Sequence, residues 1–135
     1  MSIKNTSFPF WRLIDGGLWL GYAMLIFLLS AQAKLPSTLF VVTNIDKLYH
    51  ALAYAIFAVL AARFFAHFQA RKSWTFLMTW AVTALYGVSD EWHQSFVPGR
   101  DASLGDWVAD LCGGLVGASL WLMVMSVRRQ MGTKV

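Results

Sequence analysis

The chain has 135 residues, of which 58% are hydrophobic and 13% charged, and its mean hydropathy is +0.54. Soluble domains carry about 25% charged residues, so this composition excludes an ordinary soluble domain and indicates a membrane protein. The formal net charge of +4 comes without the basic patch and stacking aromatic residues of a nucleic-acid-binding protein, so no nucleic-acid partner is expected.

Four apolar runs follow one another along the chain, and each has about the 20 residues needed to cross a bilayer. They predict helices over residues 13–33, 47–65, 74–94 and 104–127. A polar segment over residues 34–46, a basic turn over 66–73 and the Pro98-Gly99 turn connect them. We therefore expect an all-α protein, an integral membrane four-helix bundle that forms a single domain over residues 1–135.

The first apolar run has a second interpretation. Lys4 and Arg12, the apolar stretch and the Ala31-Gln32-Ala33 tripeptide are typical of a secretory signal peptide with its cleavage site. The stretch is longer than the roughly 7–15 apolar residues of a signal, and its removal leaves three helices with termini on opposite sides of the membrane. We therefore expect this helix to be retained.

The charged residues are divided unequally between the two sides of this bundle. One side receives a single acid, Asp15, and eight basic residues: Lys4, Arg12, Arg63, Arg71, Lys72, Arg128, Arg129 and Lys134. The other side receives Lys34, Lys47 and Arg100 with the remaining six carboxylates: Asp46, Asp90, Glu91, Asp101, Asp106 and Asp110. Because cytoplasmic loops are enriched in Lys and Arg, both termini are predicted to be cytoplasmic and most acids extracytoplasmic. The basic side is suited to contact with anionic membrane lipid.

The spacing of the polar residues in the second and third helices predicts which way they point. In "DKLYHALAY", Asp46, His50 and Tyr54 recur every four residues and share one helix face. In the third helix Glu91 lies on one stripe with Gly87 and Gln94. Asp90 is rotated about 100° from that stripe and is expected outside it.

The fourth helix carries acids and small residues on one face. "DWVADLCGGLVG" places Asp106, Asp110, Gly113 and Gly117 together, and the two glycines form a G-x-x-x-G pattern that permits close helix approach. Ionisable groups inside membrane helices are costly and face a cavity or a partner. The sequence therefore predicts a polar extracytoplasmic cleft built from the second, third and fourth helices.

Two interpretations stay open for the charges of this cleft. Asp106 and Asp110 either line it or pair with Lys47 or Arg100 at a neighbouring helix end. Arg100 either locks the loop by pairing with a carboxylate, for which Glu91 is a local candidate, or clamps a phosphate headgroup.

Metal binding and hydrolytic chemistry receive little support from the spacing. His50 and the surrounding carboxylates are ligand types for a divalent cation, yet no motif such as H-E-x-x-H is present, so neither a metal site nor a cofactor is predicted. Asp90, His93 and Ser95 are the residue types of a hydrolytic triad, but they lie within six residues at one helix end and cannot converge.

The segments "DKLYHALAY" and "DEWHQSFVPGRDASLGDWVADLCGGLVG" resemble the VanZ-like membrane proteins over residues 46–117. That family commonly has Asn where this chain has Asp110. Carried over position by position, the resemblance points to Asp46, Lys47, His50, Tyr54, Glu91, Gln94, Arg100, Ser103, Asp106, Gly113 and Gly117.

The resemblance implies a multi-pass protein of the bacterial inner (cytoplasmic) membrane that acts in cell-envelope biology; the namesake of the family is associated with resistance to the antibiotic teicoplanin. The first functional hypothesis is a protein that binds the headgroup of a membrane lipid or lipid-linked cell-wall precursor. Its candidate ligand-binding residues are Asp46, Lys47, His50, Tyr54, Glu91, Gln94, Arg100, Asp106 and Asp110. The alternative is an integral-membrane enzyme acting on such a substrate, with Glu91 and His50 as the candidate proton-transfer pair. Nothing in the sequence sets the oligomeric state.

Overall fold

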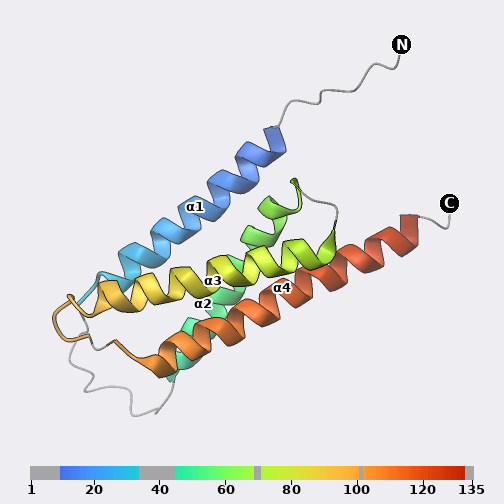
Figure 1. The fold of residues 1–135 in the computed structure, drawn as a ribbon. Helices are drawn as coiled ribbons and strands as arrows, with labels where there is room; N and C mark the ends of the chain where they lie inside the picture. Colours follow the sequence, from blue (N-terminus) through green and yellow to red (C-terminus); the bar gives the residue numbers. More distant parts are fainter. Residues whose placement is uncertain (1–9, 34–44, 69–70, 101, 133–135) are drawn as a thin grey trace.

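The computed structural model describes residues 10–33, 45–68, 71–100 and 102–132, and its secondary structure there is helical (Figure 1). The helices are α1 (Phe10–Ser30), α2 (Ile45–Phe65), α3 (Lys72–Gln94) and α4 (Leu104–Gly132). The prediction of an all-α, four-helix protein is confirmed.

The helix ends differ from the predicted ones by a few residues. α1 begins at Phe10 and ends at Ser30, where 13–33 was predicted, and α4 continues to Gly132 beyond the predicted end at 127. Apolar runs mark the part of a helix that faces apolar surroundings, whereas backbone hydrogen bonding continues past them into polar residues. Gly99 has a φ of 76°, which confirms the turn predicted at Pro98-Gly99. The predicted connection over 34–44 lies outside the described residues.

Each helix runs antiparallel to the next, so the start of α1 and the end of α4 lie at the same end of the bundle (Figure 1). α2 and α4 make the most extensive contact, α3 packs on both of them, and α1 packs mainly on α2. The aromatic core lies between α1, α2 and α3, where Phe57 stacks on Tyr86 with ring centroids 4.9 Å apart. Tyr86 also donates a hydrogen bond to the backbone oxygen of Ala23 at 2.6 Å, which ties α3 to α1.

Two glycines of α4 explain why α2 and α4 pack so closely. A Cβ atom added to Gly113 would lie 2.1 Å from the backbone oxygen of Ala51, and one added to Gly117 would lie 2.1 Å from that of Ala55. Both distances are far below any van der Waals contact. The close approach predicted from the G-x-x-x-G pattern is therefore present, and the partner helix is α2.

α1, α2 and α4 are long and apolar enough to cross a membrane. α3 is 23 residues long but falls short of the apolar composition of the other three. Its polarity is directed inward, since Thr75, Thr79 and Thr83 are buried. The less apolar composition of α3 is therefore compatible with a position among apolar neighbours, because its polar side chains are buried inside the bundle.

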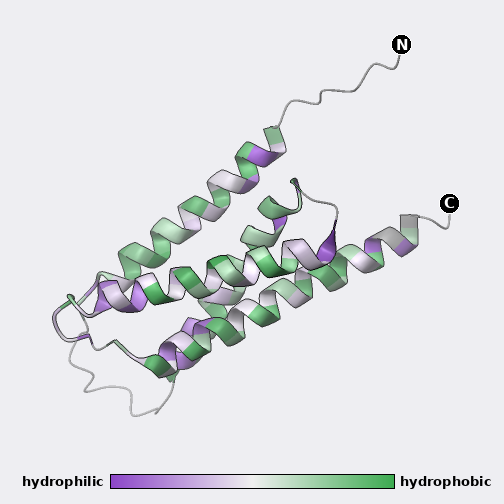
Figure 2. Cartoon of the chain, in the orientation of Figure 1, coloured by the Kyte–Doolittle hydropathy of each residue, from purple (hydrophilic) through white to green (hydrophobic). Residues whose placement is uncertain are grey.

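Hydrophilic residues lie mostly toward the ends of the helices, as the colouring of the ribbon in Figure 2 shows. The acidic end, defined by Asp46, Asp90, Glu91, Asp106 and Asp110, brings together the start of α2, the end of α3 and the start of α4. The basic end, defined by Arg12, Arg63, Arg71, Lys72 and Arg128, lies at the opposite end of the bundle. The uneven charge distribution seen in the sequence thus corresponds to a difference in charge between the two ends of the bundle.

Candidate functional site

Three ionisable side chains from three helices meet inside the acidic end: His50 of α2, Glu91 of α3 and Asp110 of α4. His50 Nδ1 lies 2.9 Å from Asp110 Oδ1. One nitrogen or oxygen atom from each of the three residues lies within 4.8 Å of the others. The Asp110 side chain is completely buried, and that of His50 is 15% exposed. We call these three residues the His50–Glu91–Asp110 cluster.

Several polar atoms of this region are buried without a hydrogen-bond partner among the described residues. Glu91 accepts a hydrogen bond from the Ser103 backbone N–H at 2.6 Å through Oε2, but its Oε1 has no partner. Asp110 Oδ2 and the Tyr54 hydroxyl are likewise unpartnered. Most buried polar groups in proteins are hydrogen-bonded, and unsatisfied ones cost stability. Two of these atoms belong to the buried carboxyl groups of Glu91 and Asp110, whose oxygens a proton, an ordered water molecule or a bound ion would satisfy.

Local sequence explains how the carboxylates are held. Ser103 precedes α4 and its hydroxyl accepts a bond from the Asp106 backbone N–H at 3.3 Å, as an N-cap does. The Ser103 backbone N–H is left for Glu91, which fixes the end of α3 to the start of α4. A Cβ added to Gly87 would lie 3.1 Å from Trp107 and 3.2 Å from Asp110 Oδ2, so this glycine leaves the room that Asp110 occupies.

Asp90 corrects the expectation that it points away from the cleft. It is only 4% exposed, and it accepts hydrogen bonds from Ser30 Oγ at 2.5 Å and Gln94 Nε2 at 2.9 Å. The expectation was wrong because α3 contacts α1 as well as α2 and α4. Two neighbouring residues that are about 100° apart on the helix can then both be buried.

Arg100 holds the loop after α3 against the end of α1. Its guanidinium donates to the backbone oxygens of Gln32 and Leu29, each at 3.3 Å, and to Gln94 Oε1 at 3.2 Å. All three acceptors are neutral. The expected pair with Glu91 is not formed, and no described carboxylate lies within ion-pair distance of Arg100. Arg100 therefore forms no ion pair within the described parts of the chain, and its link to the carboxylate of Asp90 runs through Gln94.

A cleft of about 160 Å³ opens between α1, α2 and the end of α3. We call it the His50 cleft. Its apolar lining includes Ile26, Leu29 and Ala53, and its polar lining consists of Ser30, Tyr49, His50, Tyr54, Asp90, Gln94 and Arg100. Of the His50–Glu91–Asp110 cluster only His50 reaches the cleft; Glu91 lines a second, shallower opening with Ser103 and Trp107. α1 thus forms one wall, whereas the sequence predicted walls from α2, α3 and α4.

The remaining predicted residues lie beside the cleft. Lys47 Nζ is 3.0 Å from Asp106 Oδ1 and 3.8 Å from Asp46 Oδ2. The interpretation of Asp106 as an ion-pair partner of Lys47 is therefore the one that the geometry supports. Asp46 has a side chain that is 48% exposed, and it shares a helix face with His50 without reaching the cluster.

Double-mutant cycles on the free energy of unfolding in detergent test these contacts. Glu91→Gln and Arg100→Gln share no hydrogen bond, so their effects are expected to add within about 0.5 kcal/mol. His50→Gln and Asp110→Asn remove two ends of one contact and are expected to couple by about 0.5–3 kcal/mol. Strong coupling between Glu91 and Arg100, together with additivity for His50 and Asp110, would contradict the geometry described here.

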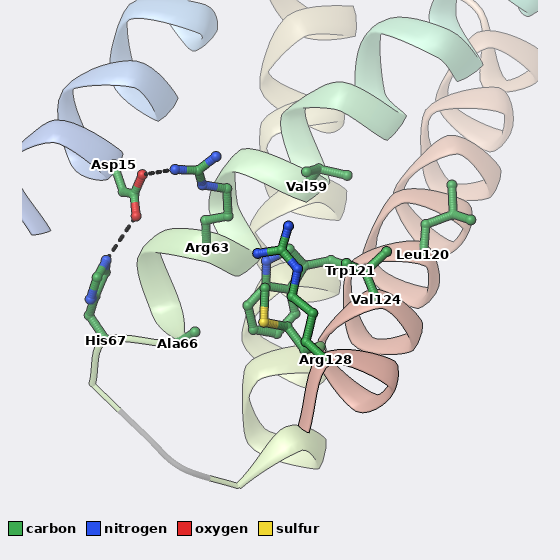
Figure 3. A pocket seen from close by; sticks show the side chains of 10 residues that line it. Asp15, Val59, Arg63, Ala66, His67, Leu120, Trp121, Val124 and Arg128 are labelled. Atoms are coloured by element: carbon green, nitrogen blue, oxygen red, sulfur yellow. Dashed lines mark hydrogen bonds and ion pairs between the residues drawn. The ribbon is translucent and has the colours of Figure 1, made fainter. Parts of the chain in front are cut away.

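The basic end has a cavity of its own, of about 510 Å³, between α2 and α4 (Figure 3). Asp15 lies at its edge and is bound by Arg63 NH2 at 2.7 Å and by His67 Nε2 at 2.8 Å. On the α4 side Trp121 and Arg128 line the cavity. The sequence pattern predicted no role for Asp15, although a single acid inside an apolar run on the basic side was a signal that could have indicated one. Its bonds to Arg63 and His67 join α1 to the end of α2, which is a structural role.

The chain matches a known protein family over most of its length. The family model described as VanZ/LLP1 matches residues 9–125, which includes the described parts of all four helices except the last turns of α4. No curated protein and no solved structure matches the chain.

Proposed function

This chain belongs to the VanZ/LLP1 family, and from that premise we propose that it binds the phosphate-bearing headgroup of a lipid or of a lipid-linked cell-wall precursor in the His50 cleft. The cleft faces the extracytoplasmic side of the bacterial inner membrane, because the basic end of the bundle is the end that remains in the cytoplasm. The protein acts in envelope biology, and glycopeptide tolerance is one phenotype that such binding affects.

The observation that carries this proposal is the guanidinium of Arg100, which lies at the cleft and forms no ion pair with a described carboxylate. A guanidinium bonded only to neutral oxygens keeps its attraction for an anion, and its planar N–H groups match the oxygen spacing of a phosphate. His50 lines the same cleft and offers a second nitrogen. A phosphate that enters the cleft therefore has a cationic partner.

The shape of the cleft supports a lipid as the carrier of that phosphate. Its volume of about 160 Å³ accommodates a small headgroup. Ile26, Leu29 and Ala53 form an apolar lining next to the polar one. Leu29 is 59% exposed and lies on the outer surface of α1, which offers a lipid chain an apolar path from the cleft to the bilayer.

A second candidate function, an enzyme acting on the same lipid, is favoured by the contact between His50 and Asp110. A histidine that faces a cleft with a buried carboxylate 2.9 Å behind it is arranged as a general base with its orienting acid. Glu91 supplies a further carboxylate within 4.8 Å. Such a group can move a proton to or from a bound headgroup, so turnover is tested together with binding.

We expect the purified protein in nanodiscs to retain phosphatidic acid over diacylglycerol, and a polyprenyl phosphate over its polyprenol, since each pair differs only in the phosphate. Arg100→Gln removes a charge-assisted contact that contributes about 1.5–3 kcal/mol, which corresponds to about ten- to hundredfold weaker retention. Native mass spectrometry of the released complexes measures the bound lipid.

The matched control is Arg71→Gln, which removes an exposed arginine at the basic end and is expected to leave retention unchanged. Equal retention of the phosphorylated and the neutral lipids would overturn the proposal, and so would equal losses in the two arginine variants. Free phosphate or a cleaved headgroup appearing with the parent protein, but not with His50→Ala, would establish the enzyme rather than the binding protein.

A further inference from the structure

With both carboxyl groups ionised, the His50–Glu91–Asp110 cluster contains more negative charge than its protein partners balance. Glu91 and Asp110 are both buried, and their oxygens lie within 4.8 Å of one another. His50 supplies at most one positive charge. Lys47 already forms an ion pair with Asp106, which lies one turn before Asp110 on α4. Two carboxylates this close and this deep repel each other unless a cation or a proton lies between them.

Unpartnered oxygens provide a second, independent observation at the same place. Glu91 Oε1 and Asp110 Oδ2 are buried acceptors with no hydrogen-bond partner in the described chain, and the Tyr54 hydroxyl is a third such group one turn after His50. Glu91 is 8% exposed, and Tyr54 and Asp110 are at most 1% exposed. The unsatisfied oxygens of Glu91 and Asp110, in a cluster with a largely buried histidine, are what a bound cation would satisfy.

We infer that His50, Glu91 and Asp110 bind a divalent transition-metal ion, such as Zn²⁺ or Mn²⁺. Bonds from zinc to nitrogen and oxygen ligands are about 2.0–2.2 Å long, so the ligands of one ion lie at most about 4.4 Å apart. Atoms that already lie within 4.8 Å reach this separation by small side-chain movements. One imidazole and two carboxylates leave further coordination positions open, as in sites that also bind a substrate.

The ligand set distinguishes between classes of cation. Ca²⁺ takes about six to eight oxygen ligands, and Mg²⁺ is bound through oxygen and water, whereas an imidazole nitrogen favours transition metals. The cluster places a nitrogen beside only two carboxylates. Zn²⁺ and Mn²⁺ are therefore expected to bind more tightly than Ca²⁺ and Mg²⁺.

A bound cation would also offset the repulsion between an anionic headgroup and the acidic side chains near the cleft. His50 lines the cleft and Asp110 lies directly behind it, so an ion on these ligands adds positive charge next to the phosphate bound by Arg100. This bridging role rests on the proposed headgroup binding. The cation site itself does not.

Titration of the full-length protein with zinc or manganese chloride tests the site. The protein is purified in detergent without a histidine tag, treated with a chelator, and followed by calorimetry and native mass spectrometry. We expect one ion per chain, and at least about tenfold weaker binding in Glu91→Gln and in His50→Ala. Circular dichroism and size-exclusion chromatography verify that both variants stay folded, and Asp110→Ala serves as a third ligand variant.

Asp106→Asn is the matched control, because Asp106 lies one turn from Asp110 on the same helix but pairs with Lys47. It is expected to retain the ion within a few-fold. Absence of binding to the folded parent, or equal binding in all variants, would overturn the site. Specific ion binding combined with phosphatidic acid retention that EDTA does not alter would overturn only the bridging role. Specific ion binding without any phosphate-dependent retention would leave the site standing and overturn the proposed function.

Discussion

Gly113→Ala and Gly117→Ala are each expected to destabilise the protein strongly, and the double variant is expected not to fold. The added methyl group would lie 2.1 Å from the backbone oxygen of Ala51 or Ala55. A backbone oxygen cannot rotate away, so α2 and α4 must separate over their most extensive contact. Overpacking of this kind costs about 1–3 kcal/mol or more at each site, and van der Waals packing is one of the main forces that hold helices together in a membrane.

A series of glycine variants separates this effect from the ordinary preference of helices for alanine. Gly21→Ala places its methyl group in open space and is expected to be neutral or stabilising by up to about 1 kcal/mol. Gly114→Ala would meet Thr83 Cγ2 at 2.6 Å, a side chain that can shift, so an intermediate loss is expected. Thermal unfolding in detergent ranks the variants. Stability of Gly113→Ala equal to that of Gly21→Ala would contradict the close approach of α2 and α4.

Reporter fusions are expected to give an all-or-none result that fixes the orientation. Alkaline phosphatase, which is active only outside the cytoplasm, should be active when fused within residues 34–44 or after Gly99, and inactive after Gln69 or Lys134. The basis is the excess of Lys and Arg at the basic end, because positively charged loops stay in the cytoplasm. Fusions to green fluorescent protein at the same positions should fluoresce in the inverse pattern, which excludes failed expression as the cause.

The fusion after Lys134 also tests whether α3 crosses the membrane. α3 lacks the apolar composition of the other helices, but it runs the length of the bundle between its two ends (Figure 1). If α3 crosses the membrane, the chain crosses four times and the carboxyl terminus is cytoplasmic. An active phosphatase there, with an active fusion in residues 34–44, would mean three crossings. An inverted pattern at all positions would place the His50 cleft in the cytoplasm and exclude an extracytoplasmic ligand.

Helical periodicity predicted which side chains lie on one face, but it could not predict which faces meet. Asp46 and His50 share a face of α2, yet only His50 reaches the cluster, because Asp46 lies in the first turn, where the packed interior ends. Arg100 was a reasonable partner for Glu91 in sequence. The turn at Gly99 instead directs Arg100 toward the end of α1, where the backbone oxygens of Leu29 and Gln32 accept its hydrogen bonds.

The sequence by itself determined the four helices, the close-packed face of α4 and the charge asymmetry between the two ends. These features follow from composition and from a repeat of 3.6 residues, which are local along the chain. Only the tertiary structure decided that His50 contacts Asp110, that Asp90 is buried against Ser30, and that Arg63 and His67 bind Asp15. Each of these contacts joins residues 48 to 60 positions apart. They depend on how far each helix is rotated and shifted against its neighbours, which the combined packing of all four helices sets.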